Sequence, residues 1–256
     1  MTPTVITIDG PAGSGKSTTA RRLADRLGWR YLDTGAMYRL MTCALVRQLL
    51  ATGRVPSDAD DAAREAAVFS LPADDIETLL TPVDCSVEPL PDERRGLRML
   101  LNGRAVDDDE LRAPLVGRAI KVVADHPAIR RRLVKLQRFV ATLGALVTEG
   151  RDQGSVVFPE SPLKFFLTAS IEERARRRLE DFRHRNHDID FETVKHDVES
   201  RDAADRARPV GALVQPEDAT VIDTTGIDPD KVIDLIIEAA EQRLAAVGRS
   251  LSDERA

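Results

Sequence analysis

Two hydrophobic patterns alternate along this chain of 256 residues: short continuous apolar runs, and apolar positions repeated at helical spacing. Short apolar runs predict buried strands, and the i, i+3, i+4 spacing predicts amphipathic helices. We expect five strands, over residues 5–8, 29–32, 143–148, 163–167 and 220–223. We expect helices over a segment that ends at Gly28 and over residues 36–50, 111–124, 127–141, 171–185, 191–207 and 229–246. This order predicts an α/β fold, with a five-stranded parallel sheet that helices flank on both faces.

One segment, residues 51–106, departs from this alternation. It contains a short acidic helix, a strand and a hairpin, over residues 58–69, 83–87 and 97–106. Within the hairpin, Asn102-Gly103 separates two β-type runs, which is typical of a type I′ turn. We therefore expect a small antiparallel subdomain inserted into the α/β pattern.

A second departure comes between the fourth and fifth strands. Two helices lie there in succession, over 171–207, and the first of them is rich in arginine. A polar turn over 184–190 is expected to join them. After the last helix, residues 248–256 are mostly polar, so we expect a frayed tail.

Composition narrows the possible functions. The net charge is −6, which argues against a nucleic acid or an anionic membrane as the main partner. The chain has only two cysteines, Cys43 and Cys85, so it has no disulfide framework, and we expect a cytoplasmic location. It shows neither a signal peptide nor an apolar stretch long enough to span a membrane.

A glycine-rich loop follows the first predicted strand. Its sequence fits G-x-x-x-x-G-K-[ST] and consists of Gly10, Pro11, Ala12, Gly13, Ser14, Gly15, Lys16, Ser17 and Thr18. A strand before this loop and a helix after it are the context in which the motif binds phosphates, so a chance glycine turn is disfavoured. Lys16 is expected to reach the β- and γ-phosphates, and the Ser17 hydroxyl to ligate Mg²⁺. The loop therefore predicts binding of a nucleoside triphosphate.

Polar residues follow two other strands of the predicted sheet. Thr34, Tyr38 and Arg39 follow the second strand, and Arg151 and Asp152 follow the third. Ligands of open parallel sheets bind at this edge, so the arginines could hold a second anionic substrate. Glu149 or Asp152 could accept hydrogen bonds from a base or a sugar, or hold Mg²⁺ through water. An exposed helix start and a salt-bridged turn are the ordinary alternatives.

Arginines on the two extra helices give further candidates. Arg201, Asp205 and Arg208 share one helix face by their spacing, although taken alone an ion pair on a solvated face explains them better. Arg174, Arg177 and Arg178 share a face of the first helix, which could close over a triphosphate or could simply be solvated. RNA binding is a weaker interpretation because no aromatic residues interleave these arginines. His184, His187 and His196 are better explained as solvated side chains than as zinc ligands.

Several of these segments together resemble one family, the bacterial cytidylate kinases, which phosphorylate CMP and dCMP with ATP. The resemblance extends from Val5 to about Leu244. Its most specific parts are IDGPAGSGK at residues 8–16, LDTGAMYR at 32–39, EGRDQGSVVFP at 149–159 and RDAADRAR at 201–208. The loop alone occurs in many families, but the combination is much more restrictive.

The resemblance implies a nucleoside monophosphate kinase fold of the P-loop type. Its core would be residues 1–50 and 107–247, with an insertion that binds the monophosphate over 51–106 and a helical lid over 171–207. By similarity, the acceptor nucleotide would contact Thr34, Tyr38, Arg39, Arg130, Arg151, Asp152, Arg201, Asp205 and Arg208. Arg174, Arg177 and Arg178 would act from the lid. Lys121 departs from the pattern, because the family often has a small hydroxyl residue there that contacts the base.

The reaction implied is in-line transfer from ATP·Mg²⁺ to the 5′-phosphate of CMP or dCMP. That acceptor is already anionic, so no strong general base is needed, and catalysis would rest on positioning and charge neutralisation by Lys16, Mg²⁺ and the arginines. We expect a monomer. A GTPase or switch ATPase is a rival without an Asn-Lys-x-Asp segment to support it, and a nucleotide-sensing or RNA-binding module is a non-enzymatic rival. Within the kinases, UMP, thymidylate and small metabolites stay open as acceptors.

Overall fold

A five-stranded sheet forms the centre of the first of two units into which the chain divides. The computed structural model describes residues 4–90, 96–183 and 189–254. The first unit comprises Met1–Leu32 and Ala141–Ala256, and the second comprises Asp33–Val140. The sheet strands are β1 (Val5–Asp9), β2 (Arg30–Asp33), β6 (Leu146–Gly150), β7 (Leu163–Thr168) and β8 (Thr220–Asp223).

The strand order in this sheet is β2-β6-β1-β7-β8. β1 pairs in parallel with β6 on one side and with β7 on the other, and β7 pairs in parallel with β8. The central strand β1 thus lies between β6 and β7, two strands that come much later in the sequence. At such a switch point the loops at the carboxyl ends of the strands diverge and leave room for a ligand. The predicted five-stranded parallel sheet flanked by helices is confirmed.

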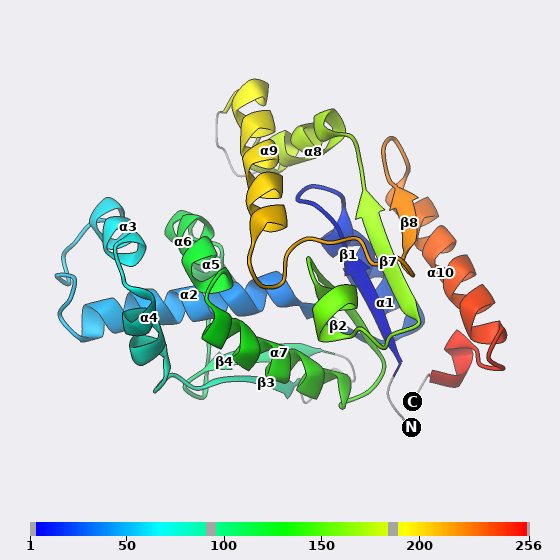
Figure 1. Ribbon diagram of the computed structural model, residues 1–256, viewed down its shortest axis with the longest axis horizontal. Helices are drawn as coiled ribbons and strands as arrows, with labels where there is room; N and C mark the ends of the chain where they lie inside the picture. The colour runs from blue at the N-terminus through cyan, green and yellow to red at the C-terminus, as the bar shows by residue number, and fades with distance from the viewer. Residues whose placement is uncertain (1–3, 91–95, 184–188, 255–256) are drawn as a thin grey trace. The chain divides into compact units, whose positions relative to one another are not determined.

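Burial explains why these segments are strands. All five residues of β1 and of β6 are buried, as expected for central strands of a parallel sheet. On one face, α1 (Lys16–Leu27) and α10 (Pro229–Ala245) pack together and cover the sheet (Figure 1). Their apolar faces join Ile6, Ile8 and Phe165 in one core cluster, so the strand that precedes the loop is held rigidly.

Two helices extend from the first unit between β7 and β8. They are α8 (Ile171–Arg183) and α9 (Phe191–Ala207), which pack against each other around Ala175, Leu179 and Val194. Figure 1 shows both helices rising beyond the end of the sheet where β1 ends. The predicted turn over 184–190 falls largely on 184–188, which lie outside the described residues.

The second unit combines helices with a small antiparallel sheet. Its helices are α2 (Thr34–Ala51), α3 (Asp61–Phe69), α4 (Ala73–Leu80), α5 (Asp108–Leu111), α6 (Pro114–Ala124) and α7 (Pro127–Ala141). Its strands are β3 (Cys85–Pro89), β4 (Leu97–Leu101) and β5 (Arg104–Ala105), in the order β3-β4-β5. Asn102 and Gly103 both have positive φ, 51° and 72°, so the predicted type I′ turn is confirmed.

Some helices begin at other residues than predicted, because local capping groups and a proline set the first residue. α2 begins at Thr34 rather than at residue 36, because the side chain of Asp33 accepts a hydrogen bond from the N–H of Ala36 at 2.9 Å. The helix expected over 111–124 begins at Pro114, which stands at the first position of α6, and Leu111 is instead the last residue of the short helix α5. α4 and a π-helical turn, Gln153–Val157, were not predicted.

The carboxyl-terminal segment also differs from the expected frayed tail. Leu251–Glu254 forms a 3-10 turn, and Leu251 is buried in the core cluster beside α10. One apolar side chain among polar neighbours is enough to dock this turn. The predicted insertion over 51–106 lies inside the second unit, and the predicted lid over 171–207 lies inside the first. Their boundaries as domains stay predictions.

Candidate functional site

The glycine-rich loop lies between β1 and α1, and its glycines are required by the backbone. A Cβ on Gly10 would lie 2.0 Å from the carbonyl oxygen of Leu167, so any side chain there would clash with β7. Gly13 and Gly15 have φ of 76° and 87°, in the left-handed region that favours glycine. The loop can therefore keep this path only with glycine at these positions.

The loop leads directly into the amino-terminus of α1. Gly15 is the N-cap residue, and no side chain of the described part of the chain caps the helix there. The first backbone N–H groups of a helix and its dipole together attract anions. The amino-terminus of α1 therefore has the features that attract an anion, and its binding of phosphate stays a prediction.

Lys16 is buried within this loop, with 5% of its surface exposed. Its Nζ donates to the carbonyl oxygen of Pro11 at 2.6 Å and lies 3.4 Å from Ser14 Oγ. Burial lowers the pKa of Lys16 to about 7; the positive charge of Arg151 also lowers it, and the carboxylates of Glu149, Asp9 and Asp205 oppose the shift. A bound polyphosphate would place negative charge next to the Lys16 ammonium group.

Ser17 and Glu149 bring two oxygen ligands together beside the loop. The Ser17 hydroxyl donates to Glu149 Oε1 at 2.7 Å, and Glu149 is adjacent to Ile8 in the β1–β6 pairing. Hydroxyl and carboxylate oxygens suit Mg²⁺, which takes few protein ligands and several from phosphates and water. No group of three or more His, Cys, Asp or Glu side chains that could hold a metal ion occurs among the residues described here.

From the sequence, Glu149 is one of two carboxylates that could hold Mg²⁺ through water or bind a base or a sugar, and the structure places it beside Ser17. Asp9, the last residue of β1, was missed altogether. Its carboxylate accepts hydrogen bonds from the N–H groups of Gln153 at 2.9 Å and Gly154 at 2.7 Å. Burial raises the pKa of Asp9 to about 7, although these two donors oppose the shift. Asp9 thus anchors the π-helical turn that begins just after Asp152.

Asp205 is bound by two of the predicted acceptor-site arginines. Its carboxylate accepts hydrogen bonds from Arg151 Nε and from Arg208 Nη2, each at 2.7 Å. Burial disfavours its charge, but the guanidinium groups of Arg151 and Arg208 outweigh this and hold the pKa of Asp205 below its usual value. The three side chains form a compact charged cluster at the end of β6.

The expectation that Arg201, Asp205 and Arg208 share one helix face needs correction. α9 ends at Ala207, and Arg208 already has extended backbone angles, so its contact with Asp205 is not a helical one. Arg201 forms a long ion pair of 3.9 Å with Asp197, one turn earlier on α9. The structure therefore brings Arg151, Asp205 and Arg208 together, with Arg201 paired to a different carboxylate.

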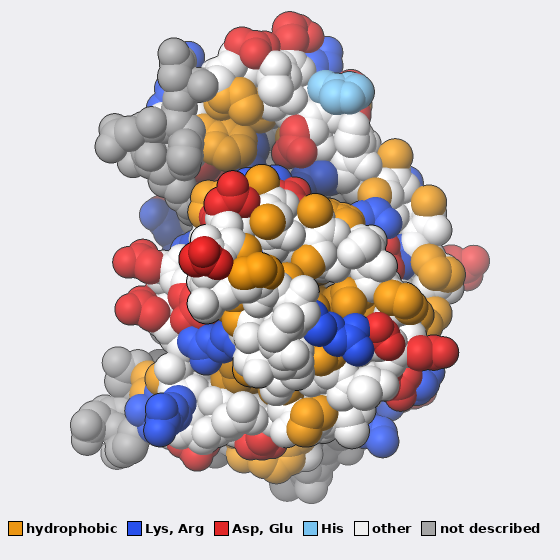
Figure 2. Space-filling model, turned by 90° about the vertical axis from the view of Figure 1, so that its left-hand side faces the viewer, with side chains coloured by type: hydrophobic (Ala, Val, Ile, Leu, Met, Phe, Trp, Pro, Cys, Tyr) orange, Lys and Arg blue, Asp and Glu red, His pale blue; other side chains and the backbone are white. Residues whose placement is uncertain are grey.

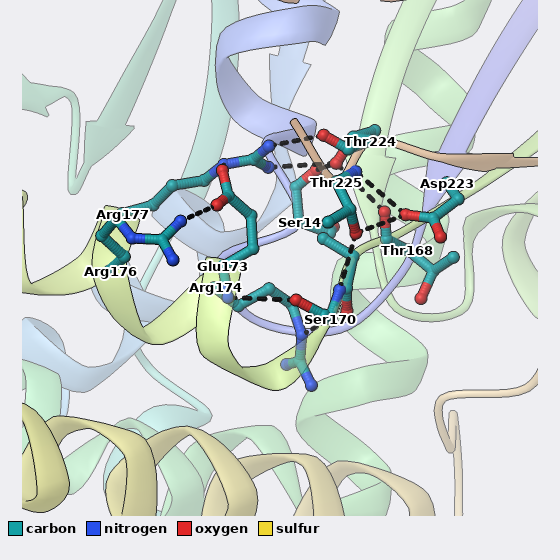
Figure 3. A network of polar contacts seen from close by, with 11 residues as sticks. Ser14, Thr168, Ser170, Glu173, Arg174, Arg176, Arg177, Asp223, Thr224 and Thr225 are labelled. Carbon is teal, nitrogen blue, oxygen red and sulfur yellow. Dashed lines mark hydrogen bonds and ion pairs between the residues drawn. The ribbon is translucent and has the colours of Figure 1, made fainter. Parts of the chain in front are cut away.

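The three arginines of the predicted lid also point in different directions. Arg177 donates to the hydroxyl and the carbonyl oxygen of Thr224, at 3.0 and 2.7 Å, and to Glu173 at 3.0 Å (Figure 3). Arg178 lies over the ring of Phe182, 4.8 Å from its centroid. Arg174 is buried and paired with Asp202. Helical spacing predicted a common face, but each guanidinium group contacts a different partner.

Thr224 links the Arg177 contact to the phosphate loop. It follows β8, is buried, and its hydroxyl donates to the carbonyl oxygen of Ser14 at 3.1 Å or that of Thr168 at 3.0 Å. Neither Thr224 nor Asp202 was singled out from the sequence, because nothing in their local pattern shows a partner elsewhere in the chain.

The remaining predicted acceptor residues lie in the second unit. Thr34 and Tyr38 are buried in the first turns of α2, which Asp33 caps. The guanidinium of Arg130 lies 5.3 Å from the centroid of the Tyr38 ring and donates to the carbonyl oxygen of Ala124 at 2.9 Å. Arg39 Nη1 lies near Gly117, 3.8 Å from where a Cβ would be. Within this unit, α2, α6 and α7 thus bring Tyr38 close to Arg130 and Arg39 close to Gly117.

The remaining expectations concern Lys121, nucleic-acid binding and membrane-spanning segments. Lys121 is largely exposed and forms an ion pair with Asp125 at 2.6 Å. On the face drawn in Figure 2, basic and acidic side chains are interspersed and the described residues form no continuous basic patch. A helix long and apolar enough to cross a lipid bilayer is not found in the part of the chain that the structure describes.

Comparison with known proteins gives consistent matches along the chain. The family model described as cytidylate kinase matches residues 6–242. A cytidylate kinase from Mycobacterium avium is 42% identical over 93% of this chain and 96% of its own length. One from Pelotomaculum thermopropionicum is 41% identical over 91% and 93%, and one from Rhodopirellula baltica is 39% identical over 94% of both chains.

Proposed function

The chain belongs to the cytidylate kinase family, and from that premise we propose how its residues carry out phosphoryl transfer. It is an ATP-dependent nucleoside monophosphate kinase, which transfers the γ-phosphoryl group of ATP to CMP or dCMP and yields CDP or dCDP and ADP. The observation that carries our assignment of roles is the loop itself, with Lys16 buried inside it and the Ser17–Glu149 pair beside it.

The loop and its neighbours form the donor half of the site. Residues Gly10–Thr18 surround the β- and γ-phosphates of ATP with backbone N–H groups, and Lys16 turns from Pro11 to these phosphates. Ser17 and Glu149 hold Mg²⁺, directly or through water. Bound by these residues, the metal ion would neutralise part of the negative charge of the phosphates. Pairing of Ser17 with Glu149 in this structure supports that assignment, because the two oxygen ligands already lie together.

The acceptor half holds the monophosphate and reads its base and sugar. We assign the α-phosphate to Arg130 and Arg151, and the nucleoside to Thr34, Tyr38, Arg39, Asp152, Arg201, Asp205 and Arg208. The Arg151–Asp205–Arg208 cluster supports this proposal, because its hydrogen bonds already hold the three side chains together. A bound phosphate would compete with Asp205 for Arg151. The acceptor oxygen is already anionic, so no residue needs to remove a proton.

Arginines of α8 supply charge to the transferring group. We propose that Arg177 and Arg178 turn toward the triphosphate when it binds, and that lid closure excludes water so that ATP is not hydrolysed. Arg174 was predicted to act in the same way. Its guanidinium is already engaged in a buried ion pair with Asp202.

The metal, the domain roles, the location and the oligomeric state complete the proposal. We propose Mg²⁺ as the metal, residues 51–106 as the part that binds the monophosphate, and 171–207 as the lid. We also propose a cytoplasmic monomer; the low cysteine content supports the location, and the negative net charge supports the absence of a nucleic-acid partner.

The proposal is tested by measuring ADP release with ATP and Mg²⁺ against CMP, dCMP, UMP, AMP, GMP and dTMP. We expect turnover with CMP and dCMP well above that with the other acceptors, because the acceptor residues match a cytidylate kinase. Turnover without any acceptor would indicate an ATPase, and salt-sensitive RNA binding without kinase activity would indicate the non-enzymatic alternative. Either result would refute the proposed function.

A further inference from the structure

A buried ion pair joins the two predicted lid helices. Arg174 in α8 and Asp202 in α9 lie 2.7 Å apart, Nη1 to Oδ2, and each side chain is only 4% exposed. Charged side chains are rarely buried this completely, because leaving water costs several kcal/mol per ion unless every polar group finds a partner. The other contacts of this pair therefore matter.

Those contacts are with the tip of the phosphate loop. Arg174 Nη1 donates to the carbonyl oxygen of Ala12 at 3.0 Å, and the N–H of Ala12 donates to Asp202 Oδ1 at 3.3 Å. Arg174 Nε donates to the carbonyl oxygen of Ala169 at 3.1 Å, just before α8. The pair thus binds both main-chain polar groups of one loop residue and ties that residue to both helices.

The neighbouring loop residue packs against the same turn of α8. A Cβ on Gly13 would lie 2.9 Å from the carbonyl oxygen of Arg174 and 3.0 Å from its Cβ. The backbone of the loop therefore lies directly on α8, with no space for a side chain between them. The path of residues 12 and 13 depends on the position of this helix.

We propose that Arg174 and Asp202 are positioning residues that hold the Ala12 peptide and thereby keep the phosphate loop in its nucleotide-binding path. The proposal rests on the proposed function, in that the loop is taken to bind ATP. It differs from a direct contact of Arg174 with phosphate, which would leave Asp202 buried without its cation and Ala12 without its donor.

A double variant tests this role without leaving a buried charge alone. Replacement of a buried ion pair by apolar residues of similar volume is often neutral for stability. We expect Arg174→Met/Asp202→Leu to fold with an unfolding temperature close to that of the wild type, but to bind a non-hydrolysable ATP analogue with Mg²⁺ about tenfold or more weakly, as measured by calorimetry. The KM for ATP should rise much more than the KM for CMP.

The matched control is a second ion pair between the same helices. Lys195 in α9 lies 3.1 Å from Glu172 in α8, and the two side chains are 29% and 57% exposed. Lys195→Met/Glu172→Leu should leave the affinity for the analogue within about twofold of the wild type, because exposed pairs contribute little. If the double variant at Arg174 and Asp202 fails to fold, Asp202→Glu tests the same contact, since the longer side chain keeps the charge but displaces the carboxylate from Ala12.

Wild-type affinity in the double variant, or in Asp202→Glu if that has to replace it, would overturn the proposal. An equal loss in the control pair would also overturn it, because the effect would then come from lid packing alone. Failure of the wild type to phosphorylate CMP or dCMP refutes the proposed function instead, and the binding comparison still decides the role of the pair.

Discussion

Lys16 shows how burial prepares a single residue for its ligand. The ammonium group lies inside the loop with a carbonyl oxygen and a hydroxyl near it, and its pKa is lowered to about 7. Its ordinary pKa is about 10.5, so above pH 7 a growing fraction of the unliganded protein has a neutral amine at this position. Phosphate charges would favour the protonated form and raise the pKa again.

We therefore predict that ATP binding takes up close to one proton at pH 8, and that affinity falls by up to tenfold per pH unit above pH 7. Calorimetry of a non-hydrolysable ATP analogue in two buffers with different ionisation enthalpies measures the uptake. Lys16→Met is the control, because methionine has an unbranched side chain of similar size and lacks the titrating group. The same uptake in that variant would show that another group is responsible.

Two glycines in elements of the second unit differ in whether the backbone angles require glycine. Gly103 completes the β4–β5 turn with φ of 72°, and the space around its would-be Cβ is open. Gly117 lies within α6, where a Cβ would meet only Arg39 Nη1 at an ordinary 3.8 Å. One glycine meets a conformational need, and the other stands in a helix where alanine would fit.

Substitution of each glycine by alanine should thus have opposite effects. We predict that Gly103→Ala lowers the free energy of unfolding by about 1 kcal/mol, because an L-residue in the left-handed region is strained. Gly117→Ala should raise it by about 0.5–1 kcal/mol, because alanine has the better helix propensity and restricts the unfolded chain. Urea denaturation monitored by circular dichroism gives both values. A neutral or stabilising Gly103→Ala would contradict the I′ assignment.

At the scale of the whole molecule, the proposed donor half lies within one unit. The loop, Lys16, Ser17, Glu149 and α8 all belong to the unit of Met1–Leu32 and Ala141–Ala256. The β4–β5 hairpin belongs to the other unit. A ligand stabilises the part of a protein that must open to release it, by mass action.

Hydrogen exchange should show this division. We predict that a non-hydrolysable ATP analogue with Mg²⁺ slows amide exchange at least about tenfold in residues 10–18 and in β6, and changes exchange in the β4–β5 hairpin by less than about twofold. Mass spectrometry of peptic fragments measures both regions in one sample, so the hairpin is the internal control. Equal slowing in both units would mean that ATP stabilises the chain as a single cooperative body.

The sequence by itself determined those features that depend on neighbouring residues. Gly10, Gly13 and Gly15 specify the loop, the run before them specifies a buried strand, and Asn102-Gly103 specifies the turn of the hairpin. Each follows from backbone angles or from hydrophobic spacing within a short segment, which is why these elements could be predicted with their approximate bounds. Family resemblance added the candidate residues of the acceptor side.

Only the tertiary structure decided which polar groups meet. Ser17 and Glu149 are 132 positions apart, Ala12 and Asp202 are 190 apart, and no local pattern links them. Arg174, Arg177 and Arg178 share a helical spacing, yet their partners are Asp202, Thr224 and Phe182. A buried charge takes whichever partner the packing of distant segments brings within hydrogen-bonding distance, so its role depends on the fold and not on the spacing.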